Sequence, residues 1–216
     1  SYFLDISSAI ETETFSIDDL SYFKSNEQGF ICQLNSFVFE LPLIGSFNLS
    51  NAMAAYKSVK SLGYDDDTLI PKLAELSPPP GRMQKLAKKN IWIDYAHTPD
   101  ALLNAVITLQ DHYPDYRIRL VFGCGGDRDK TKRQIMGKIA SENAHSIVIT
   151  NDNPRSEEPG KIIDDILAGI KVENDFQVIL DRKKAIISAV TTLDENEVLL
   201  IAGKGHVTTQ TIGSQI

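Results

Sequence analysis

Asp152, Asn153 and Arg155 stand together in the sequence NDNPR, directly after the apolar residues 147–150. A carboxylate, an amide and a guanidinium can together donate hydrogen bonds to a carboxylate and accept them from an ammonium group. An ordinary turn needs only one or two polar residues, and Pro154 makes this one stiff. The stretch therefore predicts a binding site for a molecule that carries both amino and carboxylate groups.

A second polar turn, GCGGDRDKTKR at residues 123–133, follows an apolar run and precedes a helical pattern. Its glycines, Gly123, Gly125 and Gly126, let backbone N–H groups approach a ligand, and a helix N-terminus favours anions. A tight strand-to-helix turn explains the glycines equally well, but the alternating charges after them, Arg128 included, favour a site. The spacing differs from G-x-G-x-x-G, so the support for a nicotinamide dinucleotide is weak.

Asp94 and His97 lie in a third stretch of this kind, DYAHTPDAL. Thr98 and Pro99 have a sufficient structural explanation as the N-cap and the first residue of a helix. Asp94 and His97 have no such explanation, although an isolated histidine is usually structural or solvated. Their place at the end of an apolar run favours a role in binding.

The sequence GKGH at residues 203–206 follows another apolar run, and Gly203 and Gly205 would allow the backbone to curl around a small ligand. Lys204 and His206 are also compatible with solvated side chains. Arg82 directly follows the prolines of SPPPGR. It could reach a phosphate on another domain, although taken alone it is typical of a surface arginine.

Asn48 and Asn51 are three residues apart in FNLSN, so they share one face of a helix. The spacing of apolar residues predicts this helix over residues 45–63, ending at Gly63. Helix capping accounts for Asn48 but not for Asn51, which we therefore keep as a candidate binding residue.

Residues 81–216 alternate between short apolar strands and helical segments, a pattern typical of an α/β, Rossmann-like fold with a mostly parallel sheet flanked by helices. A hairpin-like pair of strands is predicted within residues 84–95, turning at Lys89 and Asn90. Ligands bind at the carboxyl ends of the strands in such sheets. Because NDNPR, GCGGDRDKTKR and GKGH all follow strands, we expect them to form one site. The further strands are predicted at residues 117–123, 146–150, 176–180 and 197–203, and the helices at residues 99–113, 132–143, 160–170 and 182–193.

Residues 1–80 have a different pattern. Extended segments are predicted at residues 28–34 and 36–43, followed by the helix over residues 45–63 and a second helix over residues 65–76. Three consecutive prolines in SPPPGR then form a stiff connector. We therefore predict a domain boundary at about residue 80, with a partial α/β segment before it and one domain over residues 81–216.

The composition, with 42% hydrophobic and 24% charged residues, is that of an ordinary globular protein. A net charge of −7 argues against a nucleic-acid or membrane partner. No apolar run approaches the roughly 20 residues of a membrane span. The two cysteines cannot form a disulfide framework, so we expect a cytoplasmic protein. We also expect a monomer. The sequence contains no G-x-x-x-x-G-K-[ST] phosphate-binding loop, no zinc-spaced Cys/His cluster and no G-x-S-x-G elbow.

Taken in order, GSFNLSN, GRM, DYAHTPDAL, GCGGDRDKTKR, NDNPRSEEP and AGKGH resemble motifs of the Mur ligases of peptidoglycan synthesis. The DNPR turn is similar to that of the members that add meso-diaminopimelate to UDP-N-acetylmuramoyl-L-Ala-D-Glu. The resemblance implies that residues 1–80 are the tail of a central ATP-binding domain and residues 81–216 a C-terminal, amino-acid-binding domain. It also implies an acyl-phosphate intermediate, and ATP and Mg2+ as cofactors held mainly by residues outside this chain.

The resemblance implies two groups of binding residues, and no catalytic or metal-binding residue in this chain. Asn51 would contact the adenine, Arg82 a phosphate and Asp94 the ribose of the nucleotide, with His97 beside them. Val207 departs from the family pattern, which has an acid after GKGH. Loss of that carboxylate should weaken diaminopimelate binding by about 1.5–3 kcal/mol. The residues implied to hold diaminopimelate are Arg128, Asp152, Asn153, Arg155, Gly203 and Val207.

Several alternatives stay open. A lysine-adding relative would have no distal carboxylate for the two arginines, and a folylpolyglutamate-type ligase would have no use for the DNPR turn. A non-catalytic binding module is supported by the missing phosphate-binding loop, and a nicotinamide oxidoreductase by fold analogy alone. Because the sequence starts without methionine and ends in mid-pattern, we expect a fragment. The resemblance places the phosphate-binding loop and the magnesium ligands before Ser1, so we expect this chain to bind ligands weakly and to catalyse nothing by itself.

Overall fold

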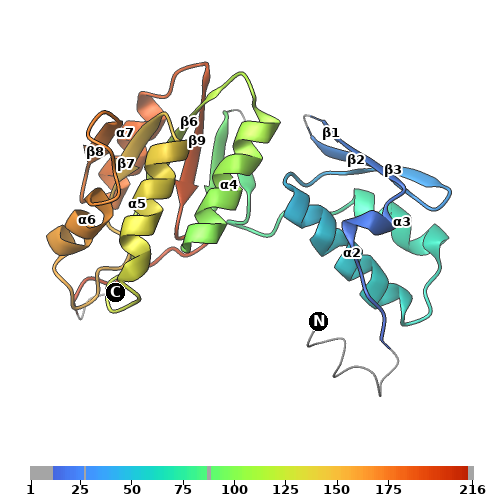
Figure 1. Cartoon of the computed structure of the whole chain (residues 1–216). Coiled ribbons are helices and arrows are strands. Elements are labelled where there is room, and N and C mark those ends of the chain that lie inside the picture. The colour runs from blue at the N-terminus through green and yellow to red at the C-terminus, as the bar shows by residue number, and fades with distance from the viewer. Residues whose placement is uncertain (1–11, 27, 87–88, 214–216) are drawn as a thin grey trace. The chain divides into compact units, whose positions relative to one another are not determined.

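The computed structural model describes residues 12–26, 28–86 and 89–213. The chain divides into two compact units, the first ending at Ser77 and the second beginning at Pro78 (Figure 1). Within the described ranges, every helix is too short or too polar to cross a lipid bilayer. Both cysteines, Cys32 and Cys124, are buried as free thiols. Burial raises the pKa of these thiols to about 11 and about 12, respectively.

The first unit contains a three-stranded antiparallel sheet in the order β1-β2-β3. The strands β2 and β3 confirm the two predicted extended segments. The strand β1 was not predicted, because it lies at the edge of the sheet with mostly exposed side chains and so shows no apolar alternation. The elements are η2 (Ile17–Asp19), β1 (Tyr22–Asn26), β2 (Gly29–Leu34) and β3 (Phe37–Leu41).

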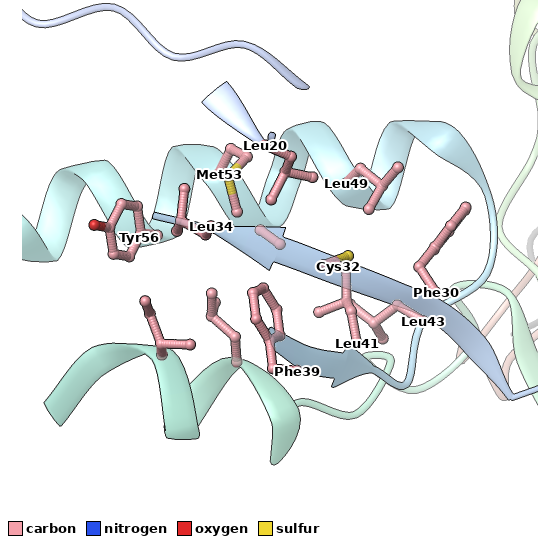
Figure 2. Close-up of a cluster of buried hydrophobic side chains, with 13 residues drawn as sticks. Leu20, Phe30, Cys32, Leu34, Phe39, Leu41, Leu43, Leu49, Met53 and Tyr56 are labelled. Atoms are coloured by element: carbon pink, nitrogen blue, oxygen red, sulfur yellow. The ribbon is translucent and has the colours of Figure 1, made fainter. Parts of the chain in front are cut away.

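Two helices, α2 (Ser46–Lys60) and α3 (Asp66–Ala74), complete this unit and confirm the predicted helices. Figure 2 shows Leu49, Met53 and Tyr56 of α2 pointing toward the strands, where they join a buried apolar cluster. Their spacing of three and four residues places them on one face of the helix, which is why the sequence folds this way.

The start of α2 differs from the prediction. Its N-cap is Gly45, and no side chain caps the helix. The Asn48 amide instead donates a hydrogen bond back to the carbonyl of Ile44 at 2.8 Å. Asn48 therefore fastens the loop before the helix rather than capping it.

The second unit is built on a six-stranded sheet in the order β4-β5-β9-β6-β7-β8. Only β4 is antiparallel to its neighbour, and the other pairs are parallel. The predicted strand pair, the mostly parallel sheet and the α/β fold class are thus confirmed. The strands are β4 (Gln84–Leu86), β5 (Ile91–Asp94), β6 (Arg117–Phe122), β7 (Ser146–Ile149), β8 (Asp175–Val178) and β9 (Glu197–Ala202).

The helices of the second unit follow the predicted segments. In Figure 1, α4 and α5 lie side by side in front of the sheet. Ala185 and Ala189 of α7 pack instead with Val121, Leu199 and other strand residues in a buried cluster. The small alanine side chains let this helix lie close to the strands. The helices are α4 (Pro99–His112), α5 (Thr131–Asn143), α6 (Pro159–Leu167) and α7 (Arg182–Thr191).

Candidate functional site

The polar turns of the second unit meet at one edge of its sheet. In the parallel register Asp94, the last residue of β5, pairs with Ala202 at the end of β9. Phe122, the last residue of β6, pairs with Ile149 at the end of β7. The turns after these four strands therefore begin at the same level, which confirms the expectation that their polar residues gather at the carboxyl ends of the strands.

The loops after β6 and β7 are fastened to each other in what we call the loop junction. The Gly126 N–H donates to the carbonyl of Asn153 at 2.9 Å. The Asp127 carboxylate accepts from both the backbone N–H and the hydroxyl of Ser156, at 3.1 and 2.7 Å. These bonds hold the two loops as one body. The junction comprises residues 123–130 and 151–158.

The glycines of the first loop serve this contact more than a ligand. A Cβ atom on Gly123 would lie 1.9 Å from the Thr150 carbonyl oxygen, and one on Gly126 would lie 1.9 Å from the Pro154 carbonyl oxygen. No side chain fits at either position. The interpretation that these glycines open the backbone to a ligand is therefore corrected for both. Only Gly125 faces a flexible group, the Arg155 Nη1 atom at 2.9 Å.

Arg133 of α5 ties the junction from inside and is completely buried. Its guanidinium donates to both oxygens of Glu157 at 2.8 and 3.0 Å, to Asp165 Oδ2 at 2.9 Å and to the Gly125 carbonyl at 3.2 Å. Hydrogen bonds from Arg133, and then from the Asp127 N–H, lower the pKa of Glu157 to about 2. The sequence analysis assigned no role to Arg133, because arginine is usually exposed and its residue type does not indicate that this one is buried.

Arg128 and Arg155 both lie close to Gly125. Arg155 Nη1 donates to the Gly126 carbonyl at 2.7 Å and to the Asn153 carbonyl at 3.4 Å. Arg128 is exposed and makes only a 3.5 Å contact with the Asp127 carbonyl. Arg155 is thus held in place at one end of its guanidinium, while Arg128 can move. The structure brings these two predicted residues together.

Residues 210–213 also reach this site, a contact that the sequence did not predict. The Gln210 amide donates to the Asp152 carbonyl at 2.6 Å. Arg155 donates its N–H to the Thr211 carbonyl at 3.2 Å and accepts from the Gly213 N–H at 2.7 Å. These bonds hold Arg155 at a positive φ of 53°, a strained value for a residue with a side chain.

Asn153 lies between this tail and the turn after β9. Its Oδ1 atom accepts from Lys204 Nζ and from the Thr211 N–H, both at 2.9 Å. Lys204 is buried, with 8% of its surface exposed. The sequence left Lys204 open as a solvated side chain, and the structure corrects that reading.

Asp152 and Gly203 are also adjacent. A Cβ atom on Gly203 would lie 3.1 Å from Asp152 Oδ2, which is buried and has no hydrogen-bond partner within the described ranges. Two buried cations lie near this carboxylate, Arg182 and Lys204. Burial lowers the pKa of both, and the charge of Asp152 partly opposes that shift. Positive groups therefore outnumber carboxylates in this part of the site.

Val207 completes the turn that follows β9. Its N–H donates to the Lys204 carbonyl at 2.8 Å, and its side chain is half-buried. The backbone of the GKGH turn is therefore closed without any contribution from the side chain at position 207. No contact of the Val207 side chain indicates a binding role.

Asp94 is buried and has a structural role. One carboxylate oxygen accepts from the Met83 N–H and the other from the Ala96 N–H, both at 2.7 Å. Burial raises the pKa of Asp94, and these two hydrogen bonds act in the opposite direction. The carboxylate thus joins the segment before β4 to the segment after β5, an explanation that the sequence did not provide.

Arg82 and His97 meet at a residue that the sequence analysis passed over, Tyr95. The Arg82 guanidinium lies 4.8 Å from the centre of the Tyr95 ring, and the His97 ring centre lies 4.7 Å from it. The His206 ring is 5.9 Å away. We call these four residues the tyrosine cluster. Arg82, His97 and His206 are exposed, so their polar ends face solvent.

His97 is oriented by its surroundings. Its Nδ1 atom lies 2.9 Å from the Tyr95 carbonyl oxygen, which can only accept, so Nδ1 carries the proton of that bond. Lys132 Nζ donates to the His97 carbonyl at 2.8 Å. In the neutral imidazole the Nε2 atom is consequently left as an acceptor.

Asn51 belongs to the first unit and is exposed on α2, where its amide donates to Asn48 Oδ1 at 3.2 Å. No group of three or more His, Cys, Asp or Glu residues within the described ranges could hold a metal ion.

Comparison with known proteins gives consistent matches. Residues 81–205 match the family model described as Mur ligase, glutamate ligase domain. A diaminopimelate ligase that acts on UDP-N-acetylmuramoyl-L-alanyl-D-glutamate, from Rickettsia felis, is 42% identical over 89% of this chain and 36% of its own length. The enzyme of the same name from Coxiella burnetii is 46% identical over 82% of this chain and 37% of its own length.

Solved structures agree. A structure of a ligase with that same name superposes with a TM-score of 0.65 at 35% identity, covering 90% of this chain and 41% of the other. The Mycobacterium tuberculosis folylpolyglutamate synthase complexed with ADP gives 0.69 at 22% identity, over 88% of this chain and 45% of the other, a likeness of fold. The chain spans between 36% and 41% of the length of the diaminopimelate ligases cited here.

Proposed function

The chain belongs to the Mur ligase family, and from this premise we propose that it is part of an ATP-dependent ligase that adds meso-diaminopimelate to UDP-N-acetylmuramoyl-L-Ala-D-Glu. In this proposal residues 1–80 are the tail of the ATP-binding domain and residues 81–216 the amino-acid-binding domain. The observation that carries it is the loop junction, where Arg128, Asn153 and Arg155 come together.

The chemistry of diaminopimelate fits this arrangement. The molecule has a zwitterionic group at each end, of which one supplies the attacking amine and the other remains free to be recognised. The guanidinium of Arg155 is fixed at one side by backbone carbonyls, so its remaining N–H groups can donate to the distal carboxylate. The mobile Arg128 can close on the same carboxylate. L-Lysine lacks that carboxylate and would leave both arginines without a partner.

The role of this unit in the reaction is to hold the nucleophile. ATP would convert the substrate's terminal carboxylate into an acyl phosphate, whose carbonyl carbon the amine attacks as phosphate leaves. Positioning the amine against that carbon makes the step effectively unimolecular. The described residues offer no metal site, so Mg2+ and the ATP phosphates would be bound chiefly by another part of the protein.

Nucleotide contacts are proposed for Arg82 and His97 of the tyrosine cluster. Arg82 presents an exposed guanidinium that suits a phosphate, and His97 presents an acceptor nitrogen. Asn51 remains the proposed adenine contact, and its exposed amide is available for one. For Asp94 both oxygens already accept backbone N–H groups, so a ribose contact would use their remaining lone pairs. We place the ligase in the cytoplasm, in peptidoglycan synthesis.

The test is a titration of the chain with meso-diaminopimelate or L-lysine, followed through backbone amide chemical shifts. We expect diaminopimelate to shift the signals of Arg128, Asn153 and Arg155 and lysine to leave them in place. An Arg155→Met variant serves as the control and should lose the response. A stronger response to lysine would overturn the substrate. For the complete protein, failure to form the amide bond from ATP and diaminopimelate would overturn the activity.

A further inference from the structure

We propose that Lys204 is a positioning residue for the amino-acid substrate: by holding Asn153 Oδ1, it forces the amide nitrogen of Asn153 toward the substrate's distal carboxylate. The inference rests on the proposed function, because it concerns how the same site reads diaminopimelate. It assigns a role to a side chain that contacts another residue rather than the substrate.

The geometry around Asn153 fixes which way its amide points. The Oδ1 atom accepts from the Lys204 ammonium and from the Thr211 backbone N–H, each at 2.9 Å. Neither group has a lone pair to accept with. Rotating the amide by half a turn would set its NH2 group against two donors, so the observed orientation is the only favourable one.

The consequence is a site of defined polarity. An amide oxygen has two lone pairs, and both are used, so Asn153 can offer a ligand only its N–H groups. N–H groups suit a carboxylate and repel an ammonium. Asn153 thereby acts with Arg155 as a second donor to the distal carboxylate. The alternative arrangement, in which the Asn153 oxygen accepts from the substrate's ammonium, would need a lone pair that this oxygen has already used.

Lys204 is poorly suited to a purely structural role. It is 8% exposed, and within the described ranges no carboxylate lies at ion-pair distance from it. Its charged neighbours are Asp152 and two further cations, Arg155 and Arg182. Burying an ammonium in such surroundings disfavours the folded state, so an apolar side chain would stabilise the fold equally well or better.

The first experiment uses the complete ligase and the variant Lys204→Met, which keeps the length of the apolar stem and removes the terminal ammonium donor. We expect the KM for diaminopimelate to rise about tenfold, as for the loss of one charged hydrogen bond, while the KM for ATP stays within about twofold. We also expect the Tm to stay unchanged or to rise. An unchanged KM for diaminopimelate, or a Tm that falls along with activity, would overturn the inference.

The second experiment asks whether Lys204 acts through Asn153. In an Asn153→Ala background, Lys204→Met should have no further effect on the KM for diaminopimelate, whereas independent roles would give multiplied effects. Asn153→Asp tests whether Asn153 donates a hydrogen bond to the substrate or accepts one from it. The variant keeps both bonds to Oδ1 but replaces the amide nitrogen with an oxygen. We expect it to lose affinity for diaminopimelate. Retained or improved affinity would mean that Asn153 accepts from the substrate's ammonium, and the inference would be wrong.

The wild-type control separates this inference from the proposed function. If the wild-type ligase does not use diaminopimelate, the proposed function fails and the inference falls with it. If the wild type uses diaminopimelate and the Lys204 and Asn153 variants behave independently, only the inference is overturned.

Discussion

The loop junction and the tyrosine cluster lie on the same edge of one sheet, yet they are held in different ways. In the junction, backbone bonds, the Asp127–Ser156 pair and the buried Arg133 fix both loops before any ligand arrives. In the tyrosine cluster, Arg82 and His97 pack against the Tyr95 ring, and their polar ends face solvent.

The difference corresponds to what each region is proposed to recognise. An amino acid that must be told apart from a close analogue needs donors that are already in place, because preorganised groups lose little entropy on binding. A nucleotide that is held mainly elsewhere needs only groups able to close over it. On this basis the junction should govern stability and amino-acid selectivity together, and the tyrosine cluster should govern nucleotide contacts alone.

The strongest challenge to the junction is the variant Arg133→Met. It leaves Glu157, and in part Asp165, without the guanidinium that pairs with both. We expect a loss of about 3 kcal/mol in the free energy of unfolding. This value is at the low end for breaking a buried ion pair, because the side chains of Glu157 and Asp165 are 15% and 47% exposed. Urea unfolding measures this value. A loss below about 0.5 kcal/mol, the range of ordinary surface changes, would mean that the network does not hold the junction.

A matched pair of glycine variants separates the contact between the loops from the contact with ligand. Gly126→Ala places a methyl group against the Pro154 carbonyl, where the backbone cannot yield easily, and should cost about 1–3 kcal/mol. Gly125→Ala meets the end of the flexible Arg155 side chain, so its stability should change little while diaminopimelate binding weakens. Thermal unfolding and calorimetric titration distinguish the two. Equal loss of stability in both variants would contradict the assignment of Gly126 to the contact between the loops and of Gly125 to the contact with the ligand.

Acid titration isolates the contribution of Glu157. Its pKa is about 2 in the fold and about 4.3 in an unfolded chain, so its ionised form stabilises the fold above pH about 4.3. That contribution is lost as the pH falls from about 4.3 to about 2. Glu157→Gln should therefore flatten the decline of stability in this window and leave its slope above pH 6 unchanged. Circular dichroism at graded pH measures both slopes, and identical curves would argue against the Arg133–Glu157 pair.

The smallest effect on stability is expected in the tyrosine cluster. Arg82→Ala should change the free energy of unfolding by no more than about 0.5 kcal/mol, because Arg82 is exposed and its ring contact is weak. In the complete ligase the same variant should raise the KM for ATP about tenfold, as for one charged hydrogen bond. Lys85→Ala, at the exposed edge of the same sheet, is the control. If both variants gave the same KM, the assignment to nucleotide would fail.

Much of the fold was predictable, since the apolar strands and helices of the second unit carry clear periodic signals and Thr98 and Pro99 mark a helix start. That the turns carrying Arg128, Asn153 and Arg155 lie at one end of the sheet was also predictable, because the loops after parallel strands converge by topology. The role of Arg133 was not predictable, since burial of a charged side chain depends on partners 24 and 32 residues away.

The contacts of Lys204 and of residues 210–213 were not predicted, for the same reason. Both act on Asn153, which is 51 residues before Lys204 and 58 residues before Thr211. No local sequence pattern indicates a hydrogen-bond partner that is so far away along the chain. Asp94 shows a further limit, because the sequence does not reveal the two backbone donors, Met83 and Ala96, that its carboxylate accepts from.

The bonds from residues 210–213 to the DNPR turn have a consequence for biosynthesis. A chain emerging from the ribosome completes β5, β6 and β7 long before Thr211 is made, and contacts between distant residues form late because their loops are costly to close. The helices and strands of this unit can assemble first, but Asn153 and Arg155 lack the bonds from residues 210–213 until that segment has docked. The proposed amino-acid site is therefore completed only after β9, the last strand of the sheet, has been made.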